Sequence, residues 1–330
     1  MSKGDMSLGK RSEEFARNHQ LENLLVDLNS NLWPVEENLL GKSGGSQPYP
    51  NILIMGPHRS GSTLFMQWLA NTGLVAYPTN LLSRFYRAPI LGAKIQMLLT
   101  EPRFDYRNEL GEFAQQAKYE SVNGKTQGVL APNEFWYFWR RFLPEPDRDV
   151  WTEPELWEGF DIDTLQRELG GLMTVFDKPF ASKAMLFNYN IPFMNEILDK
   201  VIFVQIKRDE VANAQSALEA RRRQCGSEEA WYSFRVPEYE ALKDLGPAEQ
   251  VIGHLRSINL AVDTGLEEVP EERKIVVQYE DFCEDPEKYF RQLTKKMKQQ
   301  GMDGVFEYKG PRAFRPSNER EIDPRILNAI

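Results

Sequence analysis

Cysteine is scarce in this chain. Its two cysteines, Cys225 and Cys283, lie far apart and lack the C-x-x-C spacing of metal and redox sites. The sequence therefore predicts neither a disulfide framework nor a cysteine metal site, and we expect a reducing compartment, the cytoplasm. Net positive charge is also missing, since the formal net charge is −9. A protein that coats nucleic acid needs a basic face, so this class is excluded and any anionic ligand must meet a local cluster of cations.

Long apolar runs are absent as well. The first thirty residues are polar and charged, and we expect neither a secretory signal nor a segment of about 20 apolar residues that could span a membrane. Histidine is nearly as rare as cysteine. The chain has only His19, His58 and His254, which limits the choice of a catalytic base.

The chain divides into a short N-terminal part and one large domain. Leu21, Leu24, Leu25 and Leu28 follow an i, i+3, i+4, i+7 pattern that predicts one amphipathic helix within residues 13–40. Residues 41–50, "GKSGGSQPYP", have the composition of a linker. We therefore assign residues 1–48 to an N-terminal helical extension with its linker, and 49–330 to the main domain.

Three short apolar runs predict strands at residues 52–55, 200–209 and 274–281. Helical patterns flank them, as expected for a parallel sheet covered on both faces. The predicted fold class is α/β, a central parallel sheet flanked by helices, with ligands beyond the carboxyl ends of the strands. A helical, aromatic-rich insertion at about 72–180 is expected to build a substrate pocket.

The first predicted strand runs into a loop that resembles a phosphate-binding loop. Gly56, Gly61 and Thr63 have the spacing of G-x-x-x-x-G-K-[ST], but Ser62 stands in place of the lysine, and a cation, Arg59, precedes it by three residues. A glycine turn followed by a helix N-terminus binds anions through its backbone N–H groups. Loss of the lysine removes the main contact to a terminal phosphoryl group.

Residues 59–63, "RSGST", resemble the phosphosulfate loop of sulfotransferases that use 3′-phosphoadenylyl sulfate (PAPS), most closely the bacterial and carbohydrate-type branch with PRSG[ST]. The resemblance implies a P-loop-like fold, PAPS as co-substrate, adenosine 3′,5′-bisphosphate (PAP) as product, and no metal. It also implies binding of the 5′-phosphosulfate by the loop residues Arg59, Ser60, Gly61, Ser62, Thr63 and Leu64.

A second match follows the strand at 200–209. Arg208 and Ser216 are eight residues apart, as are the arginine and serine that hold the donor's 3′-phosphate in this family. An arginine at the strand mouth and a serine two helical turns later can donate to one anion. The alternatives are a salt bridge for Arg208 and a helix-surface position for Ser216.

Further matches lie on either side. Lys183 and Asn188 occupy the places of a family lysine and asparagine, and the resemblance implies that Lys183 stabilises charge on the departing phosphate oxygen. A solvated surface lysine is the alternative. Lys309 and Gly310 match a late basic-glycine pair that closes over the 3′-phosphate, although Tyr308 replaces the arginine that usually precedes it.

The sequence differs from the family pattern at the position of the usual general base. Many cytosolic members carry a histidine two residues after the lysine, but Met185 stands here. We favour Glu134, which lies among Trp136 and other aromatic residues, and expect desolvation to raise its pKa. A role in starting a helix is the alternative for Glu134, and Glu112 and Glu120 are less attractive bases.

The aromatic run at residues 135–142 could stack on an acceptor, but such runs more often form core. The sequence thus predicts a PAPS-dependent sulfotransferase acting on a glycan, a glycolipid or a small metabolite. Two alternatives remain. One is a P-loop kinase or NTPase, which Asp209 and Asp281 would suit as magnesium ligands, and the other is a nucleotide-binding protein without turnover. The oligomeric state cannot be read from the sequence.

Overall fold

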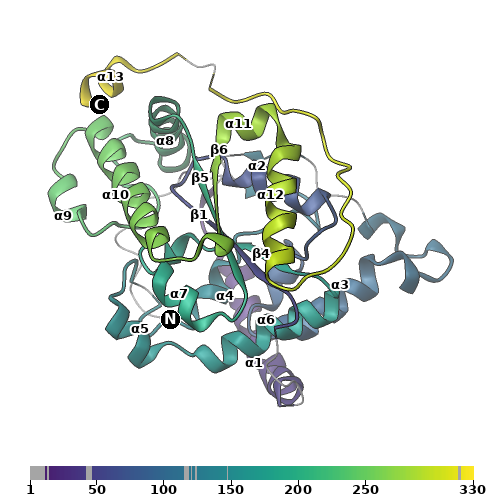
Figure 1. Cartoon of the computed structure of the whole chain (residues 1–330). Helices are drawn as coiled ribbons and strands as arrows, with labels where there is room; N and C mark the ends of the chain where they lie inside the picture. Colours follow the sequence, from purple (N-terminus) through teal and green to yellow (C-terminus); the bar gives the residue numbers. More distant parts are fainter. Residues whose placement is uncertain are drawn as a thin grey trace.

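The computed structural model describes residues 12, 15–41, 47–114, 119, 121–122, 125–146, 148–318 and 321–330. Its centre is a four-stranded parallel sheet in the order β4-β1-β5-β6 (Figure 1). The strands are β1 (Asn51–Met55), β4 (Phe180–Lys183), β5 (Val201–Lys207) and β6 (Lys274–Gln278). The predicted α/β class is therefore confirmed.

The three predicted strands are present, with two corrections at their ends. The second strand stops at Lys207, and the third stops at Gln278, because Tyr279 already begins helix α11 (Tyr279–Glu284). The fourth strand, β4, is not among the predicted ones. Its short run "FASK" includes two polar residues, yet all four of its residues are buried because it pairs with β1 and helices cover it.

Helices cover both faces of the sheet, and the side chains of β1 alternate between two cores. Leu53 and Met55 pack with α4 (Trp136–Arg140), α6 (Ile162–Phe176), α7 (Ile191–Ile197) and α10 (Pro247–Glu267). Ile52 and Ile54 pack with α2 (Ser62–Asn71), α11 and α12 (Pro286–Gln299). This period of two is what a strand buried on both faces requires.

The aromatic run is mainly core. Phe135, Phe138, Trp139 and Phe142 are buried, whereas Tyr137 is 48% exposed.

Further helices in the described part are α3 (Pro89–Thr100), α5 (Glu153–Gly159), α8 (Glu210–Cys225), α9 (Tyr239–Leu242) and α13 (Pro324–Ala329), beside a hairpin of β2 (Ser121–Val122) and β3 (Lys125–Thr126). Short 3-10 turns span Leu82–Phe85, Pro102–Phe104, Tyr106–Asn108, Gly111–Ala114, Met185–Phe187 and Glu271–Arg273. No helix of the described residues is long and apolar enough to cross a membrane.

The N-terminal helix is present as α1 (His19–Leu40), but its buried face differs from the predicted leucine stripe. Leu24 is 63% exposed, and the buried residues are Leu25, Asn29, Glu36 and Leu40. The helix packs on α3 and α6 of the insertion. Most of the predicted linker, residues 42–46, lies outside the described residues, so the boundary at residue 48 stays a prediction.

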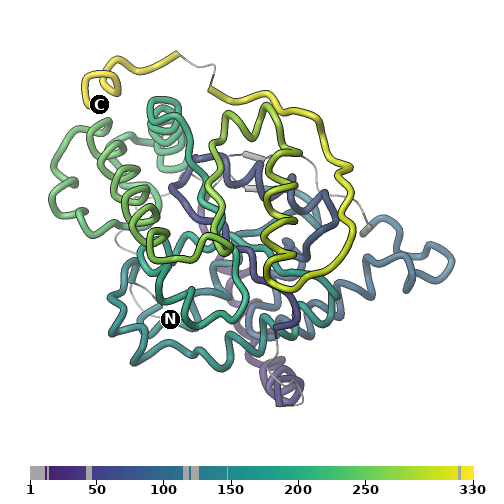
Figure 2. Tube along the Cα trace, viewed as in Figure 1, coloured from purple at the N-terminus to yellow at the C-terminus, as the bar shows by residue number. Residues whose placement is uncertain are grey.

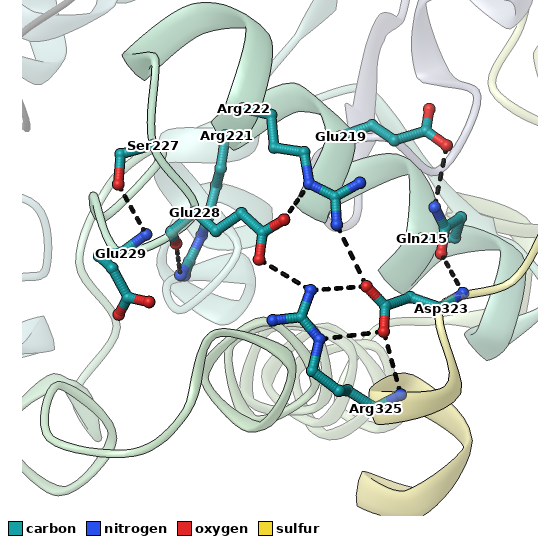
Figure 3. Close-up of polar contacts among 9 residues, drawn as sticks. All are labelled: Gln215, Glu219, Arg221, Arg222, Ser227, Glu228, Glu229, Asp323 and Arg325. Atoms are coloured by element: carbon teal, nitrogen blue, oxygen red, sulfur yellow. Dashed lines mark hydrogen bonds and ion pairs between the residues drawn. The ribbon is translucent and has the colours of Figure 1, made fainter.

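The chain after α12 returns across the molecule to α13. Figure 2 shows this last segment passing beside α11 and α12 before it reaches α13 near α8 and α10. The amide of Phe314 donates to the carbonyl of Cys283 at 2.7 Å, which holds the segment against α11. Beyond it, Asp323 and Arg325 of the α13 region form ion pairs with Arg222 and Glu228 beside α8 (Figure 3).

The buried Asn29 explains how α1 is fixed to the insertion. Its side-chain amide donates to the carbonyl of Arg84 at 2.8 Å and accepts from the amide of Arg87 at 2.8 Å. Replacement by alanine would leave both backbone groups without these partners. We therefore expect Asn29→Ala to lower the free energy of unfolding by about 1–3 kcal/mol, measured by urea denaturation.

The matched control is Asn31→Ala, because Asn31 is exposed on the same helix and bonds only within it in the described contacts. We expect a change below about 0.5 kcal/mol for this control. Equal effects of the two substitutions would show that the contacts of Asn29 do not anchor the helix.

Candidate active site

The loop that resembles a phosphate-binding loop, called the phosphate loop below, lies between β1 and α2 at the carboxyl edge of the sheet. Gly56 has φ 123°, and a Cβ there would lie 2.7 Å from the carbonyl oxygen of Ile206, so glycine is required. Asn188 holds this glycine from the opposite side. Its side-chain amide accepts from the Gly56 N–H at 3.0 Å and donates to the Gly56 carbonyl at 3.1 Å. The sequence-predicted Asn188 therefore positions the loop.

Gly61, at the other end of the loop, has φ 99° and precedes α2. A Cβ on Gly61 would lie 2.2 Å from the ring of Tyr279. Among the described residues, no side chain caps α2, so the N–H groups of its first turn stay available to a ligand. Loop and helix together have the backbone geometry that suits an anion, and anion binding itself stays a prediction.

Lys183 is the last residue of β4, next to Ile54 of β1. Its side chain is only 6% exposed, so the alternative of a solvated surface lysine is wrong. Its Nζ donates to Oγ1 of Thr63 at 2.8 Å and lies 3.2 Å from Oε1 of Glu134. A single ammonium thus joins the sheet, the phosphate loop and the insertion.

Glu134 lies just before α4, and its side chain is 38% exposed. Its carboxylate contacts Lys183 and accepts from Nε1 of Trp136 at 2.5 Å. Burial raises the pKa of Glu134, but the ion pair with Lys183, the indole hydrogen bond and the charge of Arg59 together lower it below the ordinary value. The expectation of a raised pKa is therefore wrong, because the sequence did not show that Lys183 pairs with this carboxylate.

Arg208 and Ser216, the pair expected at the 3′-phosphate, both contact Arg59 of the phosphate loop. Nε of Arg59 donates to Oγ of Ser216 at 3.2 Å, and Nη1 of Arg208 donates to the carbonyl oxygen of Arg59 at 2.8 Å. Ser216 is buried and Arg208 is 9% exposed. Arg208 also lies over the ring of Tyr279, 4.9 Å from its centroid. Phosphate loop, strand end and α8 therefore meet, as the spacing of Arg208 and Ser216 predicted.

The C-terminal segment after α12 contributes two residues that no sequence pattern indicates. Ser317 and Asn318 of this segment accept hydrogen bonds from Arg208. Lys309, which was expected at the phosphate, is 76% exposed and forms an ion pair with Glu307 at 3.1 Å. A role of Lys309 and Gly310 at the phosphate stays a prediction. More than 100 positions separate Arg208 from Ser317 and Asn318, and no motif in the sequence marks this contact.

The histidines do not supply a base at this site. His19 is exposed beside Glu22. Burial lowers the pKa of His254 to about 3, and burial together with His254 and Arg221 lowers the pKa of His58 well below its ordinary value. These two rings pack against each other with centroids 4.7 Å apart.

The other carboxylates considered lie elsewhere. Glu112 is exposed, and Glu120 lies outside the described residues. Asp209 caps α8 by accepting from the amide of Ala212, and Asp281 is 55% exposed near Lys288. Among the residues that the structure describes, no cluster of three or more His, Cys, Asp or Glu could hold a metal ion.

Comparison with known proteins decides the family. The sulfotransferase family model matches residues 50–300, most of the chain and all four strands of the central sheet. The chain belongs to the sulfotransferase family. No curated protein sequence matches this sulfotransferase.

Two solved structures resemble its fold. Sulfotransferase STF9 from Mycobacterium avium is 12% identical, with a TM-score of 0.50 over 86% of this chain and 74% of that protein. Sulfotransferase STF1 from Mycobacterium tuberculosis H37Rv is also 12% identical, with a TM-score of 0.51 over 83% of this chain and 72% of that protein. At such low identity the likeness concerns the fold, and it agrees with the predicted P-loop-like architecture.

The contact between Gly61 and Tyr279 gives a prediction for the loop. A methyl group on Gly61 meets the ring and forces a left-handed backbone on alanine, so Gly61→Ala should lower the free energy of unfolding by about 2–5 kcal/mol. Gly73→Ala is the control. Gly73 has φ 70° with nothing within 4 Å of its Cβ position, and the expected loss there is about 1–2 kcal/mol. Chemical denaturation measures both, and equal losses would refute the steric role of the ring.

Proposed function

We propose that this sulfotransferase moves the sulfuryl group of PAPS to a hydroxyl of its acceptor. The observation that carries the proposal is the position of Lys183, whose ammonium contacts Thr63 of the phosphate loop and Glu134 at once. In this proposal the N–H groups of residues 60–64, with the side chains of Ser62 and Thr63, hold the 5′-phosphosulfate. Arg208 and Ser216 hold the 3′-phosphate.

The reaction is an in-line displacement at sulfur. The acceptor oxygen forms a bond to sulfur while the bond from sulfur to the bridging phosphate oxygen breaks. Lys183 and Arg59 stabilise the negative charge on the bridging and sulfuryl oxygens, which grows in the transition state. An ammonium has three N–H donors, so Lys183 can keep both of its present partners and still donate to the leaving oxygen. The products are a sulfate ester and PAP.

Glu134 is the proposed general base, which accepts the proton of the acceptor hydroxyl and passes it to water. Its lowered pKa keeps the carboxylate ionised at neutral pH, so the base is ready in the free enzyme. The same low pKa makes it a modest base. Positioning and electrostatic stabilisation therefore carry most of the proposed rate enhancement.

The acceptor is proposed to be a small, mainly apolar molecule with one hydroxyl, such as an alcohol or a phenol. A small hollow adjoins the ion pair, and its wall consists of Glu134, Trp136, Trp139, Lys183, Met185 and Leu186. A sugar would bury several hydroxyls against apolar groups, at about 1–3 kcal/mol for each unpaired one, so a glycan or glycolipid headgroup fits this wall less well.

Binding of PAP tests the donor. We expect the protein to bind PAP more tightly than ATP in isothermal titration calorimetry, with the same affinity for PAP in EDTA as in magnesium. The Arg208 fork and the Ser216 hydroxyl suit a ribose-bound phosphate, whereas ATP lacks a 3′-phosphate. A preference for ATP, or dependence on magnesium, would instead favour a kinase or NTPase.

Substitution of the base tests the mechanism. Glu134→Gln should lower kcat by about 10²–10⁴, because proton transfer is lost, while PAP affinity stays close to that of the wild type. Glu112→Gln is the control, because Glu112 is exposed, and it should leave kcat unchanged. A Glu134→Gln enzyme with full turnover would remove this residue from the mechanism.

The pH profile provides an independent test of Glu134. Because the pKa of this carboxyl is lowered in the folded protein, kcat/KM should hold on the acid side until the pH falls below about 4.5, the ordinary pKa of glutamate. The ion pair with Lys183 should likewise stabilise the fold above that pH and lose its effect as the pH falls through the lowered pKa. An acid limb near pH 6 would contradict the assignment.

A further inference from the structure

The C-terminal segment lies on the arginine that is proposed to hold the donor's 3′-phosphate. The guanidinium of Arg208 is almost fully surrounded by protein acceptors. Its Nε and Nη2 both donate to Oδ1 of Asn318, at 3.0 and 2.8 Å, and Nη2 also donates to the carbonyl oxygen of Ser317 at 2.9 Å. Nε and Nη2 form one side of the guanidinium fork, which binds a phosphate through two parallel N–H···O bonds, so Asn318 engages the donors that a phosphate would use.

Neighbouring side chains fix Asn318 in this place. Its Nδ2 donates to Oε1 of Glu280 at 2.7 Å, and the same oxygen accepts from the amide of Asp209 at 3.1 Å. The hydroxyl of Tyr279 lies 3.3 Å from Oγ of Ser317. The contact with Arg208 is therefore part of a network at the carboxyl ends of β5 and β6.

The segment is anchored on both sides of this contact. On one side, Phe314 bonds through its amide to Cys283, and its ring stacks on Phe282. On the other side, Figure 3 shows Asp323 and Arg325 within the ion-pair network of Arg222 and Glu228. Between these anchors, Ser317 is exposed and Asn318 is half-buried, so lifting them from Arg208 uncovers little apolar surface.

We propose that Asn318 occupies the place of the donor's 3′-phosphate in the donor-free protein, so that the C-terminal segment competes with PAPS and PAP for Arg208. This inference rests on the proposed function and adds a residue that sets donor affinity. Donor binding exchanges the neutral amide oxygen for a charged phosphate oxygen, a stronger partner for the guanidinium. When PAP leaves, Asn318 returns to Arg208, so the guanidinium regains a hydrogen-bond partner as the product is released.

Competition by Asn318 lowers the apparent affinity of the protein for PAPS and PAP. A ligand that binds only the open form has an apparent Kd equal to its intrinsic Kd divided by the open fraction. If the contact keeps about nine molecules in ten closed, its removal should tighten binding about tenfold. The gain should appear mainly in the association rate, because fewer encounters meet an occupied arginine.

The test compares Asn318→Ala with Asn328→Ala in titrations of the full chain with PAP. We expect a Kd for PAP about three- to tenfold lower in Asn318→Ala. Asn328→Ala makes the same substitution at an exposed position of α13 and should match the wild type. Unchanged or weaker binding by a folded Asn318→Ala protein would overturn the proposal and make Asn318 a bystander or a donor ligand.

Hydrogen exchange of the wild-type protein gives a second measurement that does not depend on a variant. Saturation with PAP should speed amide exchange of Arg315, Ser317 and Asn318, because the segment leaves Arg208 and Ser317 then loses its hydrogen bond to Tyr279. Slowed or unchanged exchange there would overturn the proposal. If the wild type does not bind PAP at all, the donor assignment fails, whereas normal PAP binding without these effects refutes only the competition.

Discussion

A buried ammonium organises this site. Lys183 is almost fully removed from solvent, and a buried charge is costly unless it is paired and hydrogen-bonded. Its two partners come from parts of the chain that are far apart, Thr63 from the phosphate loop and Glu134 from the insertion. The need to satisfy one cation therefore brings the glycine loop and the insertion to the same strand end.

Two neighbouring side chains keep the loop in shape. Asn188 holds Gly56 through two hydrogen bonds, and Tyr279 packs directly on Gly61. Asn188 and Tyr279 can fix the shape of the loop without contacting a ligand. The open N-terminus of α2 can bind an anion only while the turn before it keeps its left-handed glycines, and these two side chains surround those glycines.

Much of this arrangement could be predicted from local sequence. The glycine spacing, the continuous apolar strands and the pair Arg208 and Ser216 are short-range patterns that report on one turn or one strand end at a time. The site residues that they indicated do meet in space. What the sequence could not show depends on contacts between distant segments. The strand β4 is too short and polar to recognise alone, the pKa of Glu134 depends on Lys183, and Asn318 reaches Arg208 only through the path of the whole tail.

The ring of Tyr279 connects three segments of the site. Tyr279 touches Gly61 of the phosphate loop, lies under the guanidinium of Arg208, and meets Ser317 of the tail through its hydroxyl. These three segments therefore share a single rigid surface, and a shift of one of them against the ring changes the packing available to the other two. A tilt of this one side chain would therefore displace the loop, the guanidinium and the C-terminal segment together, so the aromatic face acts as their common support.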